Sequence, residues 1–185
     1  MPHPIVLIGL AVLVLPLLPT GARPASAEEA ALQAFRFPNI DGGELAFSEW
    51  AGRPVLVANT ASLCAFAPQY AELQALYDEY RDEGLVVLAV PSDDFNQEYG
   101  SDAEVKDYCE LNYGLDLPMT AISHVRGEAA LPFFRWLHEE QGFEPAWNFN
   151  KVLLGADGTV LGTWGSRPSP MGDEIVGAVE RALGS

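Results

Sequence analysis

The residues with the greatest potential for chemistry are two cysteines, Cys64 and Cys109, which lie 45 positions apart. Two thiols are too few for a disulfide scaffold or a four-cysteine zinc site, but they suffice for a redox pair. Cys64 follows an apolar run at residues 54–59 and precedes a helix predicted to open near Pro68. Backbone amides at a helix N-terminus stabilise the reactive thiolate form of such a thiol. An inert core cysteine is the alternative that this local sequence leaves open.

The elements that must position Cys64 alternate between strand-like and helix-like segments, which is typical of an α/β domain. After the apolar run, Tyr70 and other large apolar residues recur at helical spacing until Gly84, and a second apolar run covers residues 85–90. A strand, a helix and a strand in this order predict two parallel neighbouring strands with a right-handed crossover.

The remaining elements complete a mixed sheet with helices on both faces. Hairpins are expected at residues 35–47, followed by a short turn capped by Ser48, and at residues 151–164 around an Asp-Gly turn. Helices are expected at residues 101–111, with Val105 and Tyr108 inward, and at residues 131–140 and 173–183. This pattern has the outline of a thioredoxin-like domain.

The charge of the chain excludes several classes of partner. The sequence has 10 Lys and Arg against 26 Asp and Glu, a formal net charge of −16. Phosphate binding depends on basic residues that release counterions, so neither a nucleic acid nor an anionic membrane surface is an expected partner. The hydrophobic content of 49% fits a single globular domain.

The first 27 residues read as a secretory signal peptide. Residues 5–18 form an apolar stretch, and Ala25-Ser26-Ala27 fits a cleavage site, although the stretch is preceded by no Lys or Arg. The stretch is too short for a bilayer core, which needs roughly 20 apolar residues. We therefore expect cleavage after Ala27, a soluble domain at 28–185 without stable membrane association, and a periplasmic or extracellular location. An uncleaved anchor is the alternative.

Three separated blocks carry a resemblance to the glutathione peroxidase family. They occur in the order and spacing of that family's signatures, at residues 59–70, 95–101 and 147–151. The similarity runs from about Phe35 to the end of the chain. It implies a thioredoxin-like fold and the reduction of hydrogen peroxide or organic hydroperoxides by a peroxidatic cysteine.

The resemblance assigns roles to four residues. Cys64 matches the peroxidatic cysteine, Gln97 the glutamine of the second block, and Trp147 and Asn148 the Trp-Asn pair of the third. A thiolate attacks the O–O bond and becomes a sulfenic acid, while the leaving oxygen takes a proton. The amide and indole N–H groups are neutral donors that can stabilise both the thiolate and the leaving oxygen. The alternatives are a solvated glutamine and a core tryptophan.

Two departures from the family pattern bear on activity and on the reductant. Leu63 stands where the family usually has Lys or Arg, which predicts lower activity or a higher pH optimum. Asp93 and Asp94 are expected near the mouth of the site, as solvated carboxylates that oppose an anionic reductant. With only the distant Arg53 as a cation, a thioredoxin-like donor is favoured over glutathione.

The segment around Cys109 resembles the one that carries the resolving cysteine in thioredoxin-dependent family members. That role implies an intramolecular disulfide with Cys64, which can require local unwinding of the second helix. A permanent structural disulfide and an unreactive thiol are the other interpretations.

No further catalytic pattern is found. His124 and His138 lack metal-ligand spacing, and no nucleotide fingerprint is present, so neither a metal nor an organic cofactor is expected. The sequence therefore predicts a thiol peroxidase. Other hypotheses are a redox sensor or thiol-transfer protein acting through Cys64, and a binding module that has lost turnover.

Overall fold

The computed structural model describes residue 30 and residues 32–184. The predicted signal peptide and its cleavage after Ala27 lie outside these residues. In the described part of the chain, no helix combines the length and apolar character needed to cross a membrane.

A four-stranded mixed sheet forms the centre of the molecule, in the strand order β4-β3-β5-β6. Strands β3 (Val55–Thr60) and β4 (Val86–Pro91) are parallel, as predicted for the βαβ unit. Strands β5 (Lys151–Leu154) and β6 (Val160–Trp164) form the predicted antiparallel hairpin, and β5 also pairs antiparallel with β3. The central strand β3 thus pairs with both β4 and β5.

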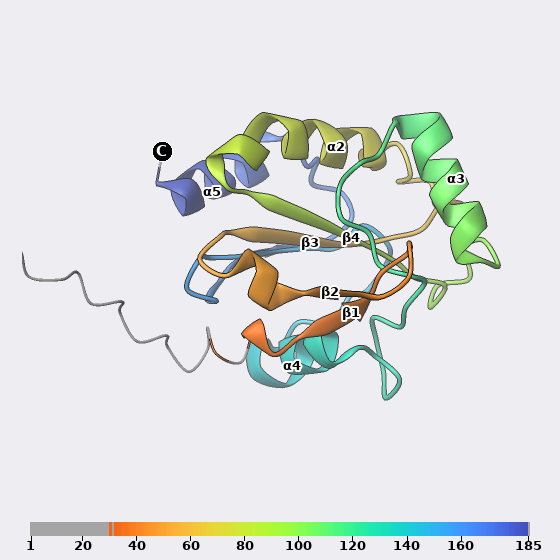
Figure 1. The fold of residues 1–185 in the computed structure, drawn as a ribbon, viewed down its shortest axis with the longest axis horizontal. Helices are drawn as coiled ribbons and strands as arrows, with labels where there is room; N and C mark the ends of the chain where they lie inside the picture. The colour runs from red at the N-terminus through yellow and green to blue at the C-terminus, as the bar shows by residue number, and fades with distance from the viewer. Residues whose placement is uncertain (1–29, 31, 185) are drawn as a thin grey trace, which may run out of the picture.

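Two helices cover one face of this sheet (Figure 1). Helix α2 (Gln69–Tyr80) connects β3 to β4 and continues into the short helix η2 (Arg81–Glu83). Helix α5 (Asp173–Leu183) lies beside α2, and α3 (Asp102–Tyr113) lies at one end of the sheet. Gly84 stops the α2–η2 segment in a left-handed conformation, φ 114°, as its position predicts.

The opposite face is covered by the N-terminal hairpin and one helix (Figure 1). Strands β1 (Arg36–Pro38) and β2 (Glu44–Ala46) pair antiparallel, and the short helix η1 (Phe47–Trp50) follows them. Helix α4 (Pro132–Gln141) packs its phenylalanines on this face. The predicted order of elements is confirmed throughout residues 35–183.

The buried strands divide their side chains between two apolar cores. Leu56 and Ala58 of β3 face the core under α2 and α5, whereas Val55 and Val57 face the core under α4. Successive strand residues point to opposite faces, so a strand covered on both sides reads as continuously apolar. Both cysteines belong to the core under α2.

One local expectation is wrong, that Ser48 caps the turn after the first hairpin. Ser48 lies inside η1, whose N-cap is Ala46 and has no side-chain cap, so Ser48 does not cap the turn. In α3, Val105 is buried and the half-buried Tyr108 packs against the same core, as expected, and Cys109 is buried as well because residues four apart share a helix face. Ser101 does cap α3, by accepting a hydrogen bond from the Glu104 amide.

Candidate active site

Cys64 lies in the tight turn between β3 and α2, as predicted. Its amide donates to the Ala61 carbonyl at 3.3 Å, and its own carbonyl accepts from Ala67 at 2.9 Å. The Phe66 amide donates a long hydrogen bond, 3.5 Å, to the Cys64 sulfur. Only 5% of Cys64 is exposed, so the thiol is largely shielded from bulk water while facing a backbone donor.

The loop that carries Gln97 is tied directly to the Cys64 turn. The Leu63 amide, next to the cysteine, donates to the Gln97 carbonyl at 2.9 Å. Leu63 itself is 55% exposed, so the position where the family usually has a cation presents an apolar surface here. The backbone therefore brings the first and second sequence blocks together.

The second and third blocks meet through their side chains. Asn148 is completely buried, and its Nδ2 donates to Oε1 of Gln97 at 3.1 Å. With its oxygen engaged, the half-buried Gln97 amide keeps its NH₂ group free to donate to another acceptor. Oδ1 of Asn148 has no hydrogen-bond partner among the described residues.

Trp147 borders an open depression on the surface. Its ring is 42% exposed and packs against Phe95, with ring centroids 5.2 Å apart. Together with Phe66 and residues 165–168, it lines a depression of about 430 Å³. Arg167 is exposed and belongs to this lining, so a basic residue borders the depression that the sequence argument did not place near the site.

The four predicted residues are thus linked, but their donors do not converge on the sulfur in this conformation. In residues 32–184, none of the Gln97, Trp147 and Asn148 side chains makes a hydrogen bond to Cys64. The Asn148 amide is instead committed to Gln97. The catalytic roles of these residues remain predictions.

Asn59 is a positioning residue that the sequence argument overlooked. This residue at the end of β3 is 1% exposed, and its Nδ2 donates to the Trp147 carbonyl at 3.0 Å. Its Oδ1 accepts from the Asn150 amide at 3.0 Å, and its carbonyl accepts from the Phe149 amide. Phe149 has φ 60°, a left-handed conformation that is uncommon for a bulky residue and needs such support. A buried asparagine ending an apolar strand was the available signal.

A buried lysine holds the segment beside the depression against α2. Lys151 is fully buried, and its ammonium donates to Oε1 of Gln69 and to the carbonyls of Ser166 and Pro168. Burial lowers the pKa of Lys151 to about 8, and the carboxylate of Glu72 opposes this shift. Three acceptors match the three donors of an ammonium group, so the charged form is well coordinated.

Cys109 is deeply buried in α3. It is 1% exposed, and both cysteines are free thiols. Burial raises the pKa of Cys109 to about 12; Glu98 and Glu110 add to the shift, and the neighbouring Tyr70 hydroxyl opposes it. The thiol of Cys109 is therefore protonated at neutral pH in this fold.

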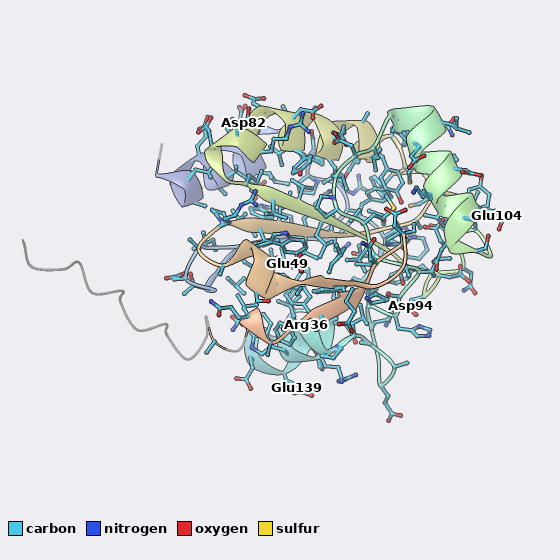
Figure 2. All side chains as sticks on the ribbon, in the orientation of Figure 1. Arg36, Glu49, Asp82, Asp94, Glu104 and Glu139 are labelled. Carbon is cyan, nitrogen blue, oxygen red and sulfur yellow. The ribbon has the colours of Figure 1, made fainter. Side chains whose placement is uncertain are left out.

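The expectation of a solvated carboxylate at Asp94 is wrong. Its side chain is 9% exposed and contacts Nδ1 of His124 at 2.6 Å. It also accepts from the amides of Val125 and Arg126, at 2.7 and 3.2 Å. Asp94, labelled in Figure 2, anchors the neighbouring loop because these amides need an acceptor. Asp93 remains exposed.

No group of three or more His, Cys, Asp or Glu residues in the described part of the chain is arranged to hold a metal ion. The chemistry available at the site is that of a shielded thiol with neutral hydrogen-bond donors nearby.

Comparisons with known proteins agree with this arrangement. The family model for glutathione peroxidase matches residues 32–138. A glutathione peroxidase-like peroxiredoxin of Schizosaccharomyces pombe is 41% identical over 135 residues, which cover 70% of this chain and 85% of the relative. A hydroperoxy fatty acid reductase of Synechocystis is 37% identical over 155 residues, which cover 78% of this chain and 90% of the relative.

Solved structures show the same fold. The crystal structure of Trgpx in apo form superposes with a TM-score of 0.66 at 29% identity, covering 84% of this chain and 96% of that one. A thioredoxin family protein from Chlorobium tepidum gives a TM-score of 0.62 at 18% identity, over 89% of this chain and 99% of that one. The fold is therefore thioredoxin-like, and the chain belongs to the glutathione peroxidase family.

Proposed function

We propose that this protein is a thiol peroxidase that reduces hydrogen peroxide and organic hydroperoxides through Cys64. The observation that carries the proposal is the joining of the three family blocks around one shielded thiol. The Leu63 amide ties the Cys64 turn to Gln97, and Gln97 is bonded to Asn148. The Trp147 ring borders an open depression that Phe66, two residues from Cys64, also lines.

The peroxidatic step follows from the chemistry of a thiolate. The sulfur attacks one peroxide oxygen, an S–O bond forms, and the O–O bond breaks. Cys64 becomes a sulfenic acid, and the leaving oxygen takes a proton to depart as water or an alcohol. Neutral donors such as the free NH₂ group of Gln97 and the Trp147 indole N–H stabilise the charge that develops on that oxygen.

Regeneration is proposed to run through Cys109. Its sulfur attacks the sulfenic sulfur of Cys64, and a disulfide and water are formed. Because Cys109 is 1% exposed within α3, a thioredoxin-like donor reaches this disulfide only if α3 opens locally. A dithiol donor then reduces it by thiol–disulfide exchange.

The surface charge supports a protein dithiol over glutathione, but less strongly than the sequence suggested. Exposed carboxylates such as Glu49, Asp82, Glu104 and Glu139 are spread over several faces of the molecule (Figure 2). Arg167, however, offers a cation at the depression beside Trp147. The case for a thioredoxin-like donor therefore rests mainly on Cys109.

Export is a separate part of the proposal. The apolar stretch at residues 5–18 and the Ala-Ser-Ala site support secretion with cleavage after Ala27. Expression of the full chain in a bacterial host, followed by N-terminal sequencing of the periplasmic product, tests it. A product that starts at Glu28 supports export, and a membrane-bound product retaining Met1 refutes cleavage.

Peroxidase activity is tested with two single-cysteine variants. Cys64→Ser is expected to abolish turnover of hydrogen peroxide and cumene hydroperoxide. Cys109→Ser is expected to keep a single oxidation of Cys64 but to lose thioredoxin-driven turnover. Full activity of Cys64→Ser would refute the peroxidase mechanism, and normal thioredoxin-driven turnover of Cys109→Ser would refute the resolving role.

A further inference from the structure

Four buried polar atoms near the Cys64 turn and the start of α2 have no hydrogen-bond partner among the described residues. Thr60 Oγ1, Ser62 Oγ, Tyr70 Oη and Glu98 Oε2 each lack a hydrogen bond within the described residues. The residues that carry them are 0%, 3%, 0% and 8% exposed. They come from the end of β3, the Cys64 turn, the first turn of α2 and the Gln97 loop. Unpaired buried polar groups cost free energy, so a cluster of four requires an explanation.

Glu98 is the ionisable member of this cluster. Its Oε1 accepts from the Ser62 amide at 3.0 Å and from the Tyr99 amide at 2.9 Å, while Oε2 is free. Burial raises the pKa of this carboxyl group, and its hydrogen bonds with Ser62 and Tyr99 oppose the shift. Glu98 is thus a carboxylate fixed by two amide hydrogen bonds, with one oxygen available for a proton, and it supports the Ser62–Cys64 turn from 36 positions further along the chain.

Tyr70 belongs to the same buried core as Cys109. The Tyr70 side chain is fully buried, and its hydroxyl lies beside the Cys109 thiol and the Thr60 hydroxyl, within the field of the Glu98 carboxylate. Cys109 also lies in that field, although it is on a different element. The thiol, the phenol and the carboxylate therefore interact within one buried region.

We propose that Glu98 accepts the proton of Cys109 through the Tyr70 hydroxyl and so activates the resolving thiol. This inference rests on the proposed resolving role of Cys109. It assigns the unpaired oxygen of Glu98 and the unpaired hydroxyl of Tyr70 a function that neither has in the peroxidatic step. A buried thiol cannot give its proton directly to water, so its deprotonation requires a proton acceptor inside the protein.

The Cys109 S–H bond breaks, its proton moves to the Tyr70 oxygen, and the Tyr70 proton moves to Glu98. The Cys109 sulfur attacks the sulfenic sulfur of Cys64, so the S–S bond forms and the S–O bond breaks. The leaving oxygen takes a proton from Glu98 and departs as water. The oxidation state of the Cys109 sulfur rises by one and that of the Cys64 sulfur falls by one, so no further oxidant is needed.

Other ionisable groups face the same region. Asp93 accepts a hydrogen bond from the Glu98 amide, and its charge raises the pKa of Glu98. Glu110 lies next to Cys109 on the exposed side of α3 and raises the pKa of that thiol. Tyr108 lies on the other side of Cys109, and its own pKa is raised by burial. None of these groups combines burial with an unpaired oxygen, which singles out Glu98.

The direction in which Glu98→Gln changes the rate of disulfide formation separates proton transfer from a simple charge effect. Loss of a negative charge near Cys109 favours its thiolate, so a charge effect alone predicts that Glu98→Gln forms the disulfide faster. Loss of a proton acceptor predicts the opposite. Glutamine keeps the Oε1 acceptor for the Ser62 and Tyr99 amides, so the Cys64 turn keeps its support. Glu110→Gln is the matched control, because it removes a charge next to Cys109 but no buried acceptor.

The experiment follows a single turnover of the full reduced protein. One equivalent of hydrogen peroxide is added in separate reactions at pH values between 6 and 9. Samples are quenched over time, and mass spectrometry quantifies the Cys64 sulfenic acid and the Cys64–Cys109 disulfide. For Glu98→Gln we expect sulfenic acid formation within about twofold of wild type and disulfide formation slowed about 100-fold. Its remaining rate should rise with hydroxide concentration across the range, whereas Glu110→Gln should match wild type or be slightly faster.

Tyr70→Phe provides a second, independent variant. It keeps the buried ring but removes the hydroxyl, so it should slow disulfide formation about tenfold or more while sparing the oxidation of Cys64. An unchanged or faster disulfide step in Glu98→Gln overturns the inference, as does an unchanged step in Tyr70→Phe if Glu98→Gln does not fold. If wild-type protein forms no Cys64–Cys109 disulfide, the proposed resolving role fails and the inference fails with it.

Discussion

Asn59 offers a direct test of how the site is held together. The Asn59→Ala change removes two buried side-chain hydrogen bonds, one to the Trp147 carbonyl and one from the Asn150 amide. The Trp147 carbonyl still accepts from Nδ2 of Asn150, so only the Asn150 amide is left unpaired. Each lost bond costs about 1 kcal/mol, and the unpaired amide adds about 1–3 kcal/mol. We expect the free energy of unfolding to fall by about 3 kcal/mol.

The same change should also impair catalysis. The side chain of Asn59 holds the Trp147 carbonyl and the Asn150 amide, which flank Asn148, whereas the backbone bond from the Phe149 amide to the Asn59 carbonyl is kept by alanine. Release of these contacts lets the Trp147–Asn148 pair drift away from Gln97. A displacement of about 1 Å in a site commonly costs about 100-fold in rate, so we expect a loss of at least tenfold in kcat/KM for cumene hydroperoxide.

Urea denaturation and steady-state kinetics of the same preparations measure both effects. A loss of about 3 kcal/mol corresponds to a decrease in Tm of roughly 6–12 °C for a chain of this size. Asn112→Ala is the control, because Asn112 is exposed on α3 and bonds only its own helix carbonyl. We expect that control to change stability by less than about 0.5 kcal/mol. A loss below 1 kcal/mol together with normal kcat/KM in Asn59→Ala would refute the positioning role.

Two further predictions concern charged residues near the depression. Arg167→Gln should lower kcat/KM for linoleic acid hydroperoxide about 2- to 5-fold at low salt, relative to its methyl ester, because an exposed charge pair contributes up to about 1 kcal/mol. The turnover of hydrogen peroxide should stay unchanged. An equal loss of kcat/KM for the acid and the ester would contradict this role. The pKa of Lys151 is lowered to about 8 in the fold, so between pH 8 and its unfolded value near 10.5 the unfolded chain binds more protons and stability rises with pH. Urea titrations at pH 7.5 and 9.5 should show this rise in wild type relative to Lys151→Met, and parallel curves for the two proteins would count against it.

Local sequence patterns predicted the fold well because each depends on neighbouring residues. The continuous apolar runs of β3 and β4 follow from burial on both faces, and the Asp-Gly turn marks the β5–β6 hairpin. Ser48 does not cap the turn because η1 starts two residues earlier than a cap at Ser48 predicts, at Phe47, whose ring enters the core. A buried aromatic outweighed a local capping preference.

Hydrogen-bond partners far apart in the sequence were not predictable in the same way. Asp94 was taken for a solvated carboxylate, yet it binds amides about 30 positions away. Arg167 enters the site only because the segment after β6 folds back beside Trp147. In both residues, the side chain type is compatible with many environments, and packing selects one.

The amino-acid sequence by itself determined the order of elements, the acidic character and the family, because periodicity, composition and the three motif blocks are carried by local stretches of chain. Only the tertiary structure decided which polar groups meet. It joins Gln97 to Asn148, places Asn59 against the third block, and leaves one oxygen of Glu98 and the hydroxyl of Tyr70 buried without a hydrogen-bond partner among the described residues. These contacts join segments up to 91 positions apart, and their geometry depends on how the sheet and its helices pack rather than on the residues adjacent to each group.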